Sequence, residues 1–160
     1  LNRISTFMEK RSIDLCDKDA DDAIKIMMTA VVGTAVVPAA VNWGITATAM
    51  GAGCVGIGKA YGVSLSKDNG EKLVIQFLKG AGLWFLAMQV GSKVLTAILQ
   101  FTGLGYGAGV ALDAATSAAF AWAIGKTAKS YFRAQYQGGK LSKEELGEVF
   151  RKAFKEKKGQ

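Results

Sequence analysis

The chain has 160 residues, of which 50% are hydrophobic, 20 are glycine and one is proline. This length and composition suit one folded domain and exclude a disordered or collagen-like segment. The chain contains no histidine, which excludes a histidine-based catalytic triad and the commonest zinc sites. It begins at Leu1 rather than methionine, and we expect it to be a piece of a longer protein.

Positive charge is concentrated at the C-terminal end. The formal net charge is +7, and residues 126–160 carry ten bases and four acids. This region favours an anionic membrane surface or an acidic partner over nucleic acid, because it has no aromatic nucleic-acid-binding motif and no arginine-dense helix. The alternative is that its lysines form only a solvated helix face: Lys143, Lys152, Lys155 and Lys158.

The N-terminal region is predicted to consist of an arm over residues 1–18, followed by the first helix. Four acidic residues precede an apolar stretch: Asp17, Asp19, Asp21 and Asp22. Carboxylates suit the positive end of a helix dipole and can cap it. We therefore expect a helix from near Asp19 to Val37, where Pro38 stops or kinks it.

Four further apolar stretches are predicted to be helical: residues 42–61, 67–78, 82–101 and 110–137. Ser66 is the expected N-cap of the second of these, and Gly82 and Gly91 are expected to interrupt the third. A glycine-rich turn is expected over residues 103–109. The pair beginning at Gly138 is expected to end the last helix.

The C-terminal helix has the clearest local signature. Ser142 and Glu145 have the spacing of a capping box, in which each residue satisfies a backbone N–H of the other. Apolar residues then follow at helical spacings: Leu146, Val149, Phe150, Ala153 and Phe154. With no alternating strand pattern, we expect a single all-α domain: an Ala/Gly-rich bundle of five to six helices, with an apolar core over 19–137 and an amphipathic helix over 140–158.

Three glycine-containing strings resemble nucleotide-binding loops, at residues 51–56, 53–59 and 120–127. Each such motif requires a strand-to-helix turn that presents backbone N–H groups to phosphate, and no strand is predicted before any of them. The P-loop match also has Ala60 where a serine or threonine should bind magnesium. We therefore expect no nucleotide, no metal ion and no other cofactor.

The same glycines belong to two series of small residues spaced four apart. The first contains Gly44, Ala52 and Gly56, and the second contains Ala115, Ala119 and Ala123. Small residues on a helix allow two backbones to approach closely. The two series predict that their helices pack on each other.

Two long uncharged runs favour membrane association. Residues 26–58 form one run, and residues 94–112 form another that ends at Asp113. The first exceeds the roughly 20 residues that span a bilayer, either as one helix or as a re-entrant hairpin. The charge of Asp113 argues against deep insertion of the second. A soluble Ala/Gly-rich bundle remains the alternative. The residues expected to contact membrane or partner are Trp43, Trp122, Lys126, Lys129 and Arg133.

Several strings resemble a bacterial family known as a domain of unknown function. Residues 60–67 (AYGVSLSK) are similar to its IYGVxLxxE passage, and residues 103–132 and 138–146 resemble its later glycine-rich and tail regions. The chain departs from that family in lacking Pro-Gly before Gly103 and in having Asn42 where an acid is common. That family includes YcjF-like inner-membrane proteins and domains attached to Era-like GTPases. The resemblance implies an all-α, membrane-associated module that often works with a GTPase, and it supplies no catalytic residues to carry over to this chain.

These observations lead to one functional hypothesis and two alternatives. The hypothesis is a non-enzymatic helical module on the cytoplasmic side of a bacterial inner membrane, which anchors or regulates a fused or separate GTPase. The alternatives are a cytoplasmic interaction module that forms a homo-oligomer and a lipid or small-molecule carrier. An enzyme is disfavoured, because no residue is spaced along the chain so that it could act with Asp113 in acid–base catalysis. Asp113 is instead expected to cap a helix.

Overall fold

A computed structural model describes residues 11–33, 41–99 and 111–159. This part of the chain forms seven helices, where five to six were expected. Their bounds are α1 Ile13–Gly33, α2 Trp43–Ala60, α3 Lys67–Ala81, α4 Leu83–Val90, α5 Ser92–Leu99, α6 Ala114–Tyr136 and α7 Lys143–Lys158. The fold is an all-α bundle, as predicted. The ends of the predicted helices near Val37 and Phe101 and the turn over 103–109 lie outside the described residues.

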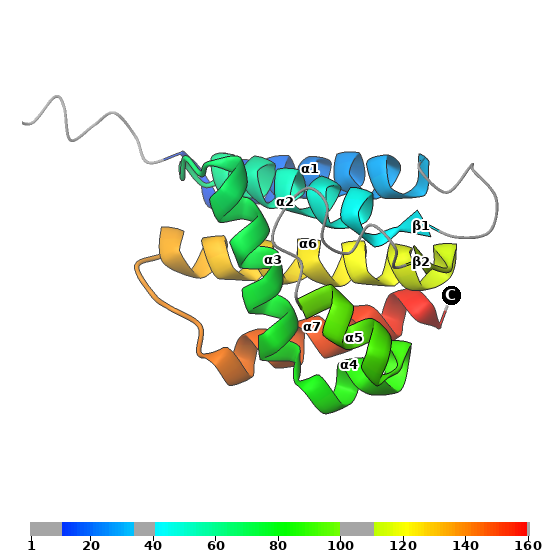
Figure 1. The fold of residues 1–160 in the computed structure, drawn as a ribbon. Helices are drawn as coiled ribbons and strands as arrows, with labels where there is room; N and C mark the ends of the chain where they lie inside the picture. Colours follow the sequence, from blue (N-terminus) through cyan, green and yellow to red (C-terminus); the bar gives the residue numbers. More distant parts are fainter. Residues whose placement is uncertain (1–10, 34–40, 100–110, 160) are drawn as a thin grey trace, which may run out of the picture.

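The helices form antiparallel pairs that α3 crosses (Figure 1). Helices α1 and α2 lie side by side, as do α6 and α7, and both α1 and α2 pack on α6. Helix α3 contacts α2 at one end and α7 at the other, and α4 and α5 follow it as a short helical pair beside α7. This arrangement leaves the face of α4 that points away from α7 without a covering helix in the described chain.

A two-residue antiparallel ladder joins the beginnings of α2 and α6. Strand β1 (Val41–Asn42) pairs with β2 (Ala111–Leu112), with Val41 opposite Leu112. No strand was expected from the sequence, since two residues are too few to produce an alternating pattern. The ladder places the first turns of two helices next to each other.

Helix α1 begins at Ile13, before the expected start near Asp19, so residues 13–18 belong to this helix and not to a separate arm. The acidic cluster therefore lies within the helix instead of capping it. Two of its members, Asp17 and Asp21, form ion pairs with α6, which accounts for acids in this position. The cap prediction for the cluster is wrong because these carboxylates satisfy charges on another helix.

The region expected to form one helix over 82–101 forms two, α4 and α5. Gly82 and Gly91 have φ angles of +96° and +84°, which residues with side chains rarely adopt. Both glycines separate neighbouring helices, as the sequence predicted, and the bend between α3 and α4 at Gly82 is 96°. The sharp bend turns α4 out of the path of α3.

The caps predicted for α3, α6 and α7 are present. Ser66 accepts a hydrogen bond from the backbone N–H of Asn69, and Ser142 and Glu145 form the complete capping box. Asp113 caps α6 by accepting from both the backbone and the hydroxyl of Thr116, at 2.7 and 2.8 Å. These hydrogen bonds lower the pKa of Asp113, with burial acting in the opposite direction. Asp113 is thus a helix cap, as the sequence predicted.

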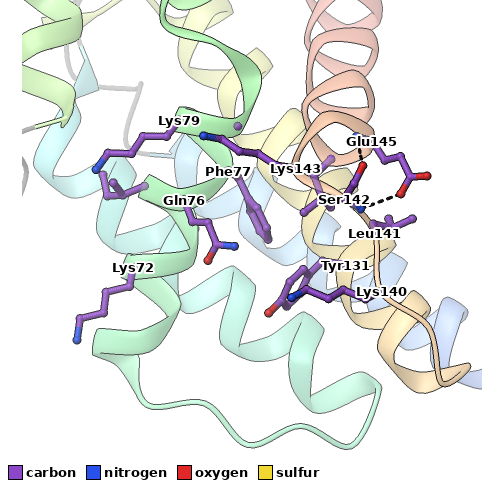
Figure 2. Close-up of a pocket in the computed structure, with 13 residues that line it drawn as sticks. Lys72, Gln76, Phe77, Lys79, Tyr131, Lys140, Leu141, Ser142, Lys143 and Glu145 are labelled. Atoms are coloured by element: carbon purple, nitrogen blue, oxygen red, sulfur yellow. Dashed lines mark hydrogen bonds between the residues drawn. The ribbon is translucent and has the colours of Figure 1, made fainter.

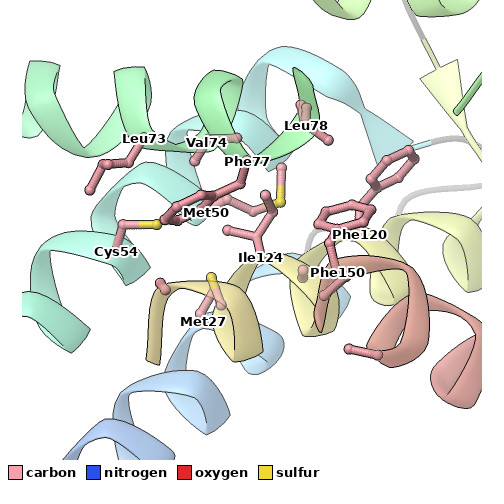
Figure 3. Close-up of a cluster of buried hydrophobic side chains, with 14 of the residues drawn as sticks. Met27, Met50, Cys54, Leu73, Val74, Phe77, Leu78, Phe120, Ile124 and Phe150 are labelled. Carbon is pink, nitrogen blue, oxygen red and sulfur yellow. The ribbon is translucent and has the colours of Figure 1, made fainter. Parts of the chain in front are cut away.

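An aromatic cluster fills the centre of the bundle (Figure 3). The ring of Phe120 on α6 lies 5.1 Å from Phe154, 5.7 Å from Trp43 and 6.3 Å from Phe150, measured between centroids. All four side chains are fully buried. Edge-to-face contacts of this kind add to the stabilisation that burial provides. Helices α2, α6 and α7 therefore share one core.

Helices α2 and α6 pack on each other, as the two series of small residues predicted, but the series themselves do not form the contact. Ala119 and Ala123 are buried in α6, but Ala52 and Ala115 are exposed. A Cβ atom added at Gly56 would lie 3.6 Å from Ala23 on α1, not against α6. Residues four apart drift by about 40° per step around a helix, so such a series cannot stay at one interface.

The close approaches occur at other glycines. A Cβ atom at Gly70 on α3 would collide with the backbone oxygen of Gly51 on α2. Gly44, the first member of the predicted packing set, is half-buried at the start of α2. The α2–α3 crossing thus depends on glycines outside the predicted packing set.

Candidate functional site

The predicted contact residue Trp43 is fully buried against Phe120 and faces no solvent. It cannot serve as an interfacial anchor in this fold. Its position in the core follows from the β1–β2 ladder, which brings the first turn of α2 onto α6. The prediction for Trp43 is therefore corrected to a role in packing.

Trp122 on α6 is half-buried beneath two lysines. The Nζ atom of Lys126 lies 4.5 Å from the centroid of a Trp122 ring, and that of Lys157 lies 5.6 Å away. Ammonium groups over the face of a tryptophan are attracted to the ring electrons. Lys126 is therefore held over a ring of its own helix and stays partly exposed, whereas Lys157 reaches Trp122 from α7.

The other two predicted basic contacts join α6 to α1. Lys129 Nζ lies 2.7 Å from Asp21 Oδ1, and Arg133 Nε lies 3.1 Å from Asp17 Oδ2. The charges of Lys129 and Arg133 are thus balanced within the chain. They remain at the edge of the bundle, but a role in attracting an anionic surface is weakened by these pairs.

Tyr61 completes this cluster by donating a hydrogen bond from its hydroxyl to Asp17 Oδ1 at 2.5 Å. Burial raises the pKa of Asp17, but the hydrogen bonds from Tyr61 and Arg133 outweigh it and hold that pKa below its usual range. Burial and the neighbouring carboxylate raise the pKa of Tyr61 far above its usual range. Asp17 stays charged and Tyr61 stays neutral at physiological pH, as a structural cluster requires.

Helix α4 carries the most exposed hydrophobic surface of the described chain. Trp84 is 80% exposed, Met88 is 69% exposed and Leu83 is 54% exposed. Trp84 and Met88 are one helical turn apart and so share a face. The opposite side of the helix carries Leu86, which is fully buried. We call Leu83, Trp84 and Met88 the α4 apolar face.

Lysines from three other helices surround α4. Lys158 on α7 donates to Gln89 at 3.2 Å, and Lys155 on α7 places its Nζ atom 5.8 Å from the Phe85 ring. Lys79 lies at the end of α3, just before α4, and the exposed Lys93 lies at the start of α5. The sequence did not predict this grouping, because Lys79 and Lys93 lie far along the chain from Lys155 and Lys158.

None of the described helices is by itself both long and apolar enough to cross a bilayer. Helices α3 and α4, which are joined at a bend, together have the length and apolar composition that a membrane span requires. The predicted 26–58 run is divided between α1 and α2, and these two helices pack against each other and on α6.

The described residues contain no cluster of three cysteine or acidic side chains that could hold a metal ion. Both cysteines are free and buried, and burial raises the pKa of the Cys54 thiol to about 12. A thiol with such a pKa is almost entirely protonated at neutral pH and is a poor nucleophile. Cys54 is therefore a protonated thiol in the core of the bundle.

Comparison with known families gives one match. The model of a family described as a domain of unknown function (DUF697) matches residues 2–159. Searches of curated proteins and of solved structures found no match.

Proposed function

Because the chain belongs to the DUF697 family of domains of unknown function, which assigns no activity, we propose a function from the surface of the fold. The domain is a non-enzymatic helical module that docks on an anionic membrane surface through the α4 apolar face. In that position it holds or regulates a GTPase carried in the same chain or in a partner.

The exposure of Trp84 is the single observation that carries the docking proposal. An indole ring that is 80% exposed loses contact with water when it enters the interfacial layer of a bilayer, where tryptophan is enriched in membrane proteins. Met88 and Leu83 would enter with it. Removing apolar surface from water contributes about 25 cal/mol per Å², so a short helix with three such side chains supports reversible docking and not permanent insertion.

The surrounding lysines favour lipid over a second copy of the chain. Lys79, Lys93, Lys155 and Lys158 give the rim of α4 one sign of charge. A basic residue close to an anionic membrane surface contributes about 1 kcal/mol to binding. A symmetric dimer through α4 would instead bring two positive rims together, which is unfavourable.

The GTPase part of the proposal depends on the sequence resemblance to domains attached to Era-like GTPases. Its test is a binding measurement between this domain and an Era-like GTPase of the same organism, loaded either with GDP or with a nonhydrolysable GTP analogue. We expect binding to differ between the two nucleotide states. Failure to bind in both states would refute this part alone.

Vesicle co-sedimentation tests the docking proposal. The intact chain is expected to bind vesicles of phosphatidylcholine that contain roughly 30% phosphatidylglycerol, because the anionic lipid attracts basic residues. It should bind vesicles of pure phosphatidylcholine less well. Trp84→Ser with Met88→Ser should weaken binding about tenfold. Ile26→Ser is the matched control, since Ile26 is 71% exposed on α1, and it should bind normally.

Two results would contradict the docking proposal. One is vesicle binding that the double variant and the Ile26→Ser control affect equally. The other is a concentration-dependent dimer that the double variant abolishes, which would make the α4 apolar face an interface between copies. Thermal unfolding of each variant should match that of the parent, because the substituted side chains are exposed.

A further inference from the structure

A cleft of about 950 Å³ opens between α3, the end of α6 and the start of α7 (Figure 2). One wall is the face of α3 that carries Lys72, Gln76 and Lys79. The other wall is the connection from α6 to α7, together with Lys143 in the first turn of α7. Figure 2 shows the Lys143 side chain extending across the opening toward α3.

The cleft is lined by four lysines and one carboxylate. Lys72 forms an ion pair with Asp68 at 3.0 Å, and the Glu145 carboxylate accepts from the Ser142 backbone N–H at 2.8 Å. The other three lysines have no carboxylate within ion-pair distance in the part of the chain that the structure describes: Lys79, Lys140 and Lys143. Lysines from α3, the α6–α7 connection and the first turn of α7 thus line one cleft together with a single glutamate, and positive charge exceeds negative charge in its lining.

The floor of the cleft is aromatic and rigid. Phe77 on α3 is buried, and its ring lies 5.6 Å from that of Tyr131 on α6 in an edge-to-face contact. Leu141 and Leu146 add apolar surface beside these rings. Because the rings are packed against the core, the floor holds its shape while the lysines above it retain freedom to move.

We propose that this cleft binds a phosphate-bearing anion. Lysine ammonium groups bind phosphate as point charges, and several of them suit a group that carries more than one negative charge. Four lysines against one glutamate give the lining of the cleft an excess of positive charge, which attracts an anion. The apolar floor accommodates the organic part of a phosphate compound, as in most small-molecule sites.

The cleft differs from the nucleotide-binding loops considered from sequence. Those loops bind phosphate with backbone N–H groups at a glycine-rich turn, whereas here the donors are side chains from α3 and the α6–α7 connection. The inference goes beyond the proposed function, since a soluble phosphate compound or a lipid headgroup carries the same chemistry. Lys79 borders both the cleft and α4, so a headgroup is the source that would link the two surfaces.

Calorimetric titration with sodium pyrophosphate at low salt tests the cleft directly. We expect binding to the intact chain that weakens as salt is added, and a rise in thermal unfolding temperature with ligand concentration. Lys79→Gln and Lys143→Gln should each weaken binding about fivefold. Lys59→Gln, which removes the same charge from the exposed end of α2, should leave binding unchanged.

A second arm uses dihexanoyl phosphatidylglycerol below its micelle concentration, which presents a headgroup without a membrane surface. If the chain binds this lipid but not pyrophosphate, and the binding is lost in Lys79→Gln and Lys143→Gln, the result supports a cleft that binds the phosphate of a lipid headgroup. Binding of both ligands supports a general phosphate site. Equal effects of the two cleft variants and Lys59→Gln, or binding of neither ligand, would overturn the proposal.

Membrane docking through the α4 apolar face and anion binding in the cleft can be tested independently of each other. Trp84→Ser with Met88→Ser should weaken vesicle docking about tenfold and leave pyrophosphate binding intact, because the α4 apolar face lines no part of the cleft. The cleft variants should keep their folding, since the three lysines are exposed and unpaired in the described chain. Their thermal unfolding without ligand should equal or slightly exceed that of the parent.

Discussion

Nε of Arg133 on α6 lies 3.1 Å from Oδ2 of Asp17 on α1, although 116 residues separate them in the chain. The same carboxylate accepts the hydroxyl hydrogen of Tyr61, the residue that follows α2. One partly buried charge thus joins the ends of three helices. It explains why acidic residues occur inside α1 rather than only at its start.

Replacing that charge is expected to destabilise the fold. Asp17→Asn should lower the free energy of unfolding by about 1 kcal/mol, because the amide is a weaker partner for Arg133 and Tyr61. Asp22→Asn is the matched control, since Asp22 forms only an exposed pair with Lys25 at 3.9 Å. Denaturant unfolding should place the control within about 0.5 kcal/mol of the parent. Equal losses in both variants would contradict a special role for Asp17.

The same carboxylate predicts a pH dependence. The pKa of Asp17 is lower in the folded chain than in the unfolded chain, where it is about 3.9. Its contribution to stability is therefore complete above that unfolded pKa and is lost as pH falls through the lower, folded pKa. Between about pH 5 and pH 2 the free energy of unfolding should fall less steeply in Asp17→Asn than in the parent. Parallel curves would show that Asp17 is not perturbed.

Glycine substitutions test which helix crossings are tight. Gly70→Ala should lower the free energy of unfolding by roughly 1–3 kcal/mol or more, because the new methyl group meets the backbone oxygen of Gly51, which cannot move aside. Gly56→Ala meets only an ordinary contact at 3.6 Å and should be neutral or stabilising by up to about 1 kcal/mol, the usual helix preference for alanine. Thermal unfolding separates the two. The opposite order would contradict the packing described.

The buried thiols predict slow chemical labelling. At pH 8 a thiol with a pKa of about 12 is ionised to roughly one part in ten thousand, and Cys54 is also fully buried. Cys16 is buried as well. A disulfide reagent should therefore label neither cysteine in the folded chain at an appreciable rate and should label both in guanidinium. Fast labelling of the folded chain would contradict the packing of α1 and α2.

Much of the local structure could be predicted because its causes lie close together in the chain. Ser66, Ser142 with Glu145, and the glycine that follows α6 act on backbone groups within one turn. The breaks at Gly82 and Gly91 were predicted for the same reason. The start of α1 was misplaced because its acids are held by Arg133 and Lys129, which local spacing cannot indicate.

The surface was harder to predict than the helices. Trp43 and Trp84 both lie in apolar stretches, yet one is fully buried and the other is 80% exposed. The difference arises because the ladder places Trp43 against Phe120, whereas the bend at Gly82 turns α4 outward. Likewise, Lys79 and Lys143 line the same cleft only because α3 packs against α7.

The family and the helical class follow from the amino-acid sequence, and so do the caps of α3, α6 and α7 and the breaks at Gly82 and Gly91, since caps and breaks depend on residues acting on their own turn of backbone. The pairing of charges, the glycines that touch another helix and the aromatic side chain that meets solvent follow from the three-dimensional arrangement of the helices. These features depend on how helices that are distant in the chain cross one another. The residues that meet at a crossing are far apart in the sequence, so their spacing does not indicate the contact.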